Sequence, residues 1–221
     1  QFHVDSFMFF IEELDLNNLT LFCQDWGSLI GFRLVTGAPD RFARVVAGNA
    51  AFPAGGAKDG MVIGTQWTTP DPKAELHFEE GFMGWLKYSQ SVVEFDSGYI
   101  IQSATVRELS QAEVDAYRAP FPDERYKAGA RVMPALVMSQ QTTNTAAWKV
   151  LEQFEKPFLT TFSDGDAVTK GGEKAFQMRV PGAKGQPHVI VKGGHFLQED
   201  AGAELVERIN AFIAATTVSK P

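Results

Sequence analysis

The sequence predicts an α/β fold in which helices alternate with parallel strands and a long helical insertion divides the sheet. In the first 50 residues, apolar patterns of period 3.6 alternate with short apolar runs that suit buried strands. From about 52 to 132, Gly and Pro punctuate helical stretches, and no convincing central strand occurs. The strand-and-helix pattern then resumes up to the end of the sequence. Such alternation is typical of βαβ units around a parallel sheet.

The elements follow one another in a regular order. The first part contains the expected elements helix 2–14, strand 19–24, helix 27–37 and strand 44–48. The last part contains helix 143–155, strand 156–162, strand 188–192 and helix 197–215. Within the insertion, Ser110 and Glu113 have the spacing of a capping box that opens a helix. We therefore expect three segments, namely a first core part at 1–51, a helical cap at 52–132 and a second core part at 133–221.

The composition excludes several classes of function. With 221 residues, 44% of them apolar, the chain can bury a sizeable core, whereas its net charge of −7 argues against nucleic acid or anionic membrane as a partner. Cys23 is the single cysteine, so no internal disulfide framework is possible. No apolar run is long enough to span a bilayer. We expect no metal, nucleotide or flavin cofactor, because the four histidines are scattered and no P-loop or GxGxxG motif occurs.

A candidate nucleophile lies where the first expected strand meets its helix. The run CQDWG at 23–27 has the frame small-x-nucleophile-x-small of the nucleophile turn in the α/β-hydrolase fold, with Asp25 at its centre. This turn strains the backbone of the nucleophile, and small flanking residues let strand and helix approach. The positive end of helix 27–37 favours an ionised Asp25. The alternative is that Asp25 only caps this helix, which is the commoner role of such an aspartate.

Two later turns supply the partners of such a nucleophile. Asp164 and Asp166 follow strand 156–162, and His195 follows strand 188–192. The order nucleophile, acid, histidine is that of the α/β hydrolases, and each residue lies just beyond the carboxyl end of a strand. We prefer Asp166 to Asp164 as the acid, because the apolar-Val-Thr run after Asp166 matches the usual pattern, whereas Asp164 with Gly165 suits a plain turn.

With these residues in place, the sequence resembles the haloalkane dehalogenases, in particular those that bind halide with two tryptophans. The similar stretches are the nucleophile motif CQDWGSLIG at 23–31, the cap stretch GFMGWLKY at 81–88, a second cap stretch within 116–129 and the histidine motif GHFLQE at 194–199. The resemblance extends from about 2 to 214. It implies the α/β-hydrolase fold with a helical cap, and hydrolysis of haloalkanes to alcohol and halide through an ester on Asp25.

The resemblance also assigns roles to single residues. It implies that Asp25, Asp166 and His195 are catalytic, that Trp26 and Trp85 bind the halide, and that Phe82, Phe121 and Pro122 line the pocket. Indole nitrogens donate hydrogen bonds without adding charge, which suits an anion that must be released again. Trp67 and Trp148 have no counterpart in the motifs, and we expect both to be structural. The partners would be a small halogenated aliphatic substrate, water and the halide product, with a cytoplasmic monomer as the full-length form.

One departure from the family and two alternatives remain. The His-Gly-x-Pro-type loop that the family carries upstream has no match here, so the sequence resembles the C-terminal two-thirds of a dehalogenase, with the first strands of the sheet missing. An epoxide hydrolase would use the same aspartate with tyrosine donors, and the insertion offers tyrosines at 88, 99, 117 and 126. The other alternative is an inactive fragment or a binding protein.

Overall fold

The computed structural model describes the chain except residues 56–62, 64–65, 67–68 and 217–221. Trp67 and part of the expected cap segment therefore lie outside the described residues. The described strands form one parallel sheet in the order β1-β2-β3-β4, composed of β1 (Leu19–Asp25), β2 (Phe42–Ala50), β3 (Phe158–Ser163) and β4 (Val189–Val191). This arrangement confirms the predicted parallel α/β sheet.

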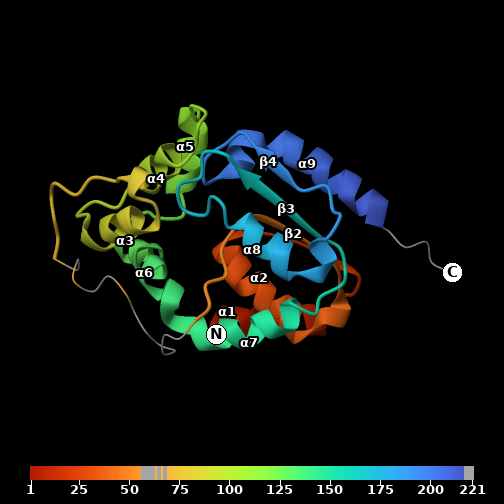
Figure 1. Ribbon diagram of the computed structural model, residues 1–221. Coiled ribbons are helices and arrows are strands. Elements are labelled where there is room, and N and C mark those ends of the chain that lie inside the picture. Colours follow the sequence, from red (N-terminus) through yellow and green to blue (C-terminus); the bar gives the residue numbers. More distant parts are fainter. Residues whose placement is uncertain (56–62, 64–65, 67–68, 217–221) are drawn as a thin grey trace.

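Helices cover both faces of this sheet and form a separate group beside it (Figure 1). The helices of the core are α1 (Phe2–Glu13), α2 (Trp26–Gly37), α7 (Gln141–Leu151), α8 (Glu173–Arg179) and α9 (Leu197–Thr216). The group beside the sheet contains α3 (Phe82–Ser91), α4 (Ser97–Ser103), α5 (Gln111–Arg118) and α6 (Ala128–Leu136). Among the described residues, no helix is both long enough and apolar enough to cross a bilayer.

The core lies on both sides of the sheet because neighbouring strand residues point to opposite faces. Val45 and Ala47 on β2 belong to the large cluster with the residues of α2, α7 and α8. Val46, between them, packs instead with Leu159 and with Phe212 of α9. Phenylalanines dominate the larger cluster, where the rings of Phe32, Phe158 and Phe176 lie within 5.9 Å of one another by centroid distance.

Most predicted elements are present, with shifted ends. Strand β2 begins two residues earlier and ends two residues later than expected, and α7 begins at Gln141 and ends at Leu151 rather than running to 155. The predicted capping box is present, since the Ser110 hydroxyl accepts from the Glu113 N–H while the Glu113 carboxylate accepts from the Ser110 N–H. Helix α6 continues through residue 132, where we expected the cap to end. Helix α8 was not predicted, because it has only seven residues and buries only Phe176.

Candidate active site

Asp25 occupies a strained turn between β1 and α2. It is the last residue of the strand and the N-cap of the helix, with φ of 48° and ψ of −122°, a backbone conformation that costs energy for a residue other than glycine. Its carboxylate makes no capping hydrogen bond to the helix and lies instead 3.3 Å from Nε2 of His195. The side chain of Asp25 is therefore not a helix cap, although the residue has the cap position.

The close approach of strand and helix lies one turn beyond the expected position. A Cβ atom on Gly27 would meet only Cβ of Cys23 at 3.8 Å, an ordinary contact. A Cβ atom on Gly31 would lie 2.9 Å from the end of the Leu21 side chain, so strand and helix approach more closely at Gly31 than at Gly27. The turn itself is held by Ser28, whose fully buried hydroxyl lies 2.5 Å from the Asp25 carbonyl oxygen and accepts from the Ala51 N–H at 3.0 Å.

His195 lies between the Asp25 carboxylate and a buried acid. Its Nδ1 lies 3.1 Å from both carboxylate oxygens of Asp166, and its Nε2 faces Asp25. Asp166 is fully buried and also accepts from the Val168 N–H at 2.7 Å and from the Thr169 hydroxyl. The carboxylate of Asp164, the other candidate acid, accepts from the Gly193 N–H at 3.2 Å and, among the described residues, makes no hydrogen bond to the imidazole. The structure thus brings Asp25, His195 and Asp166 together in a row.

This arrangement sets the charges of the two buried groups. Burial alone disfavours a charged imidazole, but the bonds and charges of Asp166 and Asp25 outweigh it and raise the pKa of His195 to about 10. Burial would likewise raise the pKa of Asp166, yet the facing His195 and the donors from Thr169 and Val168 hold that pKa below its usual value. With Asp25 ionised, His195 is therefore a protonated group between two carboxylates.

Asn49 fixes the histidine loop, and the sequence analysis did not identify it. It is fully buried near the end of β2, with φ of 38°. Its amide nitrogen donates to the carbonyl oxygens of Gly194 and His195 at 3.0 and 2.9 Å, and its amide oxygen accepts from the Ser163 N–H at 2.9 Å. A polar asparagine near the carboxyl end of an otherwise mostly apolar, buried strand is the signal in the sequence.

Asp200 joins the histidine loop to the helical group beside the sheet. Its carboxylate accepts from the backbone N–H of Gly194 at 2.7 Å and from those of Val106 and Arg107 at 3.0 and 2.9 Å. Gly194 lies so close to this segment that a Cβ atom on it would be 2.2 Å from the Ala104 carbonyl oxygen. The position of the histidine loop is therefore tied to the segment between α4 and α5.

A cavity of about 240 Å³ opens above these groups. Asp25 and His195 border it, together with both tryptophans that the motifs indicated, Trp26 and Trp85, and with Phe82. The remaining walls are apolar side chains, namely Phe78, Ile100, Ala130, Met133, Pro134, Val137, Val168 and Phe196. Within the described part of the chain, neither indole N–H donates to another protein group. The cavity thus combines a carboxylate, an imidazole and two free N–H donors within apolar walls.

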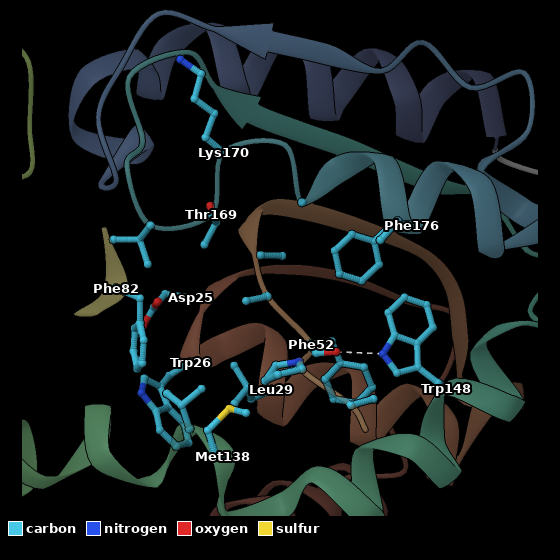
Figure 2. A pocket seen from close by; sticks show the side chains of 18 of the residues that line it. Asp25, Trp26, Leu29, Phe52, Phe82, Met138, Trp148, Thr169, Lys170 and Phe176 are labelled. Carbon is cyan, nitrogen blue, oxygen red and sulfur yellow. Dashed lines mark hydrogen bonds between the residues drawn. The ribbon is translucent and has the colours of Figure 1, made fainter. Parts of the chain in front are cut away.

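A second cavity, of about 510 Å³, is also bordered by Asp25. Figure 2 shows Asp25, Trp26 and Phe82 at one end and Phe52, Trp148 and Phe176 at the other. Trp148 is structural here, because its buried N–H donates to the Phe52 carbonyl oxygen at 2.8 Å.

Two predicted pocket residues lie elsewhere. Phe121 borders a different hollow, with Arg118, Glu124 and charged neighbours, and Pro122 is exposed outside every cavity at Asp25. Neither Phe121 nor Pro122 is among the residues that line the two cavities at Asp25.

The described residues contain neither a tyrosine donor nor a metal cluster at this site. None of the four tyrosines lines a cavity at Asp25, and the hydroxyl of Tyr117 donates to Glu199 at 2.5 Å. In the same part of the chain, no group of three or more His, Cys, Asp or Glu side chains is arranged to hold a metal ion.

Known proteins are similar to this chain in sequence and in fold. No protein-family model matches the chain. It is 48% identical to a haloalkane dehalogenase from Psychrobacter cryohalolentis over 96% of this chain and 66% of the relative. It is 36% identical to haloalkane dehalogenase 1 from Mycobacterium bovis over 97% of this chain and 67% of the relative.

Among solved structures, the fold is similar to that of a tetrameric haloalkane dehalogenase from Paraglaciecola agarilytica, with a TM-score of 0.71, 23% identity, and coverage of 99% of this chain and 67% of that one. The chain spans about two thirds of the length of these relatives. More than a third of the aligned residues are identical over nearly the whole chain, and the chain therefore belongs to the haloalkane dehalogenase family.

Proposed function

We propose that this protein hydrolyses haloalkanes to an alcohol and a halide ion through an ester on Asp25. The observation that carries the proposal is the row Asp25, His195, Asp166 beneath a cavity with apolar walls and two free indole donors. A carboxylate at neutral pH is already charged, so Asp25 attacks a saturated carbon without a general base. The carbon–halogen bond breaks as the carbon–oxygen bond of the ester forms.

Trp26 and Trp85 are the proposed halide donors. The departing halide carries a full negative charge into apolar surroundings, where an unpaired ion is costly. Two N–H donors stabilise it as it forms and, being neutral, let it leave afterwards. Both indoles border the cavity that contains Asp25, and neither is bound to another described residue.

His195 becomes a base only after the first step. In the free protein, Asp25 and Asp166 both raise the pKa of His195, so the imidazole is protonated. Alkylation converts Asp25 into a neutral ester and removes one of the two anions, which lowers the pKa of His195 towards neutrality. The imidazolium releases its Nε2 proton to solvent, and the neutral imidazole then takes a proton from water as the hydroxide attacks the ester carbonyl. That proton passes to the leaving alcohol. The backbone N–H of Trp26, the first residue of α2, is the proposed donor to the oxyanion.

Asp166 orients this base throughout. Its carboxylate holds the proton on Nδ1, so that Nε2 faces the ester, and it stabilises the imidazolium that forms. The helices α3 to α6 would act as the cap that closes the apolar chamber, with Phe82 as a pocket residue. An epoxide hydrolase is disfavoured because none of the tyrosines borders a cavity at Asp25.

The partners and the assembly follow from this proposal. A small halogenated aliphatic molecule, water and halide are the proposed partners. A monomeric full-length form stays a prediction, which light scattering of the purified protein tests. Cytoplasmic location stays a prediction as well.

Release of bromide from a short dibromoalkane tests the function. We expect release by the parent protein, none by Asp25→Asn, and a single stoichiometric release by His195→Gln. In His195→Gln the mass of the peptide that contains Asp25 should increase by one alkyl group. Asp164→Asn is the matched control and should release bromide like the parent, because this carboxylate contacts only the Gly193 N–H. Continued turnover in Asp25→Asn would exclude the ester.

A further inference from the structure

Gln24 places a hydrogen-bond donor on the catalytic imidazole. Its amide nitrogen lies 3.2 Å from the carbonyl oxygen of His195 and 3.3 Å from Nε2 of the same residue. A backbone carbonyl oxygen can only accept, so the Gln24 atom beside it must be the NH₂ nitrogen and not the oxygen. The second N–H of this amide is therefore available to Nε2 of His195.

Nε2 of His195 consequently has two neighbours of opposite kind. The Asp25 carboxylate oxygen at 3.3 Å accepts and stabilises a proton on Nε2. The Gln24 N–H lies 3.3 Å from Nε2 and would donate to a lone pair there, so it stabilises the form without a proton on Nε2. While Asp25 is ionised, its charge prevails, because a charged acceptor binds more strongly than a neutral donor. Once Asp25 is an ester, its negative charge is gone. Of the two neighbours of Nε2, Gln24 is then the one that favours Nε2 without a proton over Nε2 with a proton.

We propose that Gln24 is a positioning residue that selects the neutral, Nδ1-protonated form of His195 when Asp25 carries the alkyl group. This proposal rests on the proposed function, since it concerns the base of the hydrolytic step. Gln24 favours the lone pair on Nε2, and its long contact is readily replaced by a water molecule, which donates its proton there. The same amide fixes the carbonyl oxygen of His195, so the ring and its loop are held together.

The other groups around the imidazole do not supply this selection. Asp25 and Asp166 are the ionisable side chains that face it, and both favour the protonated ring. The Phe196 ring packs edge-on, at a centroid distance of 5.1 Å. On neighbouring loops, Asp164 accepts from the Gly193 N–H and Asp200 from the Gly194 N–H, so both carboxylates bind the backbone and not the ring.

A nitrogen NMR titration of His195 tests the proposal without turnover. The protein would carry Asp25→Asn, which makes position 25 neutral as in the ester, and the two ring nitrogens report protonation and tautomer separately. In this background we expect Gln24→Met to raise the pKa of His195 by about 1 and to increase the fraction with the proton on Nε2. Gln24→Glu should raise the pKa by about 2, because it places an anion beside Nε2.

Two comparisons keep the test decisive. Gln177→Met removes an amide that donates to the Thr160 hydroxyl at 2.8 Å, away from the site, and should leave the titration of His195 unchanged. Gln24→Glu preserves the size of the side chain, so it serves alone if Gln24→Met does not fold. An unchanged or lowered pKa of His195 in the Gln24 variants, or an equal rise in Gln177→Met, would overturn the proposal.

A kinetic measurement connects the titration to the reaction. In the parent background, Gln24→Met should move the acid limb of ester hydrolysis upwards by about one pH unit and lead to accumulation of alkyl-protein, with alkylation little changed. Equal slowing of both steps at every pH would overturn the proposal. A shifted titration in a protein that releases no bromide would instead refute the proposed function and leave the role of Gln24 on the imidazole intact.

Discussion

Replacing Trp85 by phenylalanine separates halide binding from packing. Trp85 lies on α3, and its ring packs against Phe78, Tyr88 and Phe95 at centroid distances of 6.4, 6.4 and 6.1 Å. Its N–H has no partner among the described residues. Phenylalanine retains an aromatic ring at these contacts and removes only the donor and part of the ring area.

The expected effect is large on halide binding and small on stability. A hydrogen bond to an ion contributes about 1.5–3 kcal/mol, so chloride should bind about 10- to 150-fold more weakly. The smaller ring should lower the free energy of unfolding by about 1 kcal/mol, since Trp85 is only partly buried and already borders a cavity. Alkylation should slow as well, because the same donor stabilises the departing halide.

Chloride binding is measured by the broadening of the chloride NMR line, and stability by urea unfolding. Trp148→Phe is the matched control, because its N–H already donates to the Phe52 carbonyl oxygen inside the core. It should lose about 1–3 kcal/mol of stability and bind chloride like the parent. Unchanged chloride affinity in Trp85→Phe, or an equal loss in Trp148→Phe, would refute the assignment of Trp85.

Two further predictions concern the acid and the core. Asp166→Asn removes an anion that raises the pKa of His195, so that pKa should fall. Because the base must be neutral, the acid limb of ester hydrolysis should move to lower pH, while the maximal rate of hydrolysis should drop by roughly 10⁴-fold. Single-turnover pH profiles measure both changes. A limb that moves upwards would contradict the direction. Phe32→Ala empties a fully buried site between Phe52, Phe158 and Phe176 and should cost about 3–5 kcal/mol in urea unfolding. A loss below about 1 kcal/mol would mean that the three rings collapse into the space.

The sequence alone was sufficient for the elements and for the ends of the strands. Helical and strand periodicity placed β1, α2, β2, β3 and β4 near their observed positions. In a parallel sheet the carboxyl ends of the strands lie along one edge, so the residues at the ends of β1, β3 and β4 were expected on the same edge of the sheet. This explains why Asp25, a nearby acid and His195 could be expected together before any coordinates.

Only the tertiary structure decided which side chains meet at that edge. Asp164 and Asp166 are two residues apart, and the path of their loop turns Asp166 onto the imidazole and Asp164 onto the Gly193 N–H. The contacts of Asn49 and Asp200 with the histidine loop join residues that are about 145 and 6 positions apart in sequence, and neither distance follows from local periodicity. Phe121 borders a different hollow, beside Arg118 and Glu124, and the spacing in the sequence did not indicate this position. Periodicity reports burial along one element, whereas these contacts depend on the directions in which several loops leave their strands and helices.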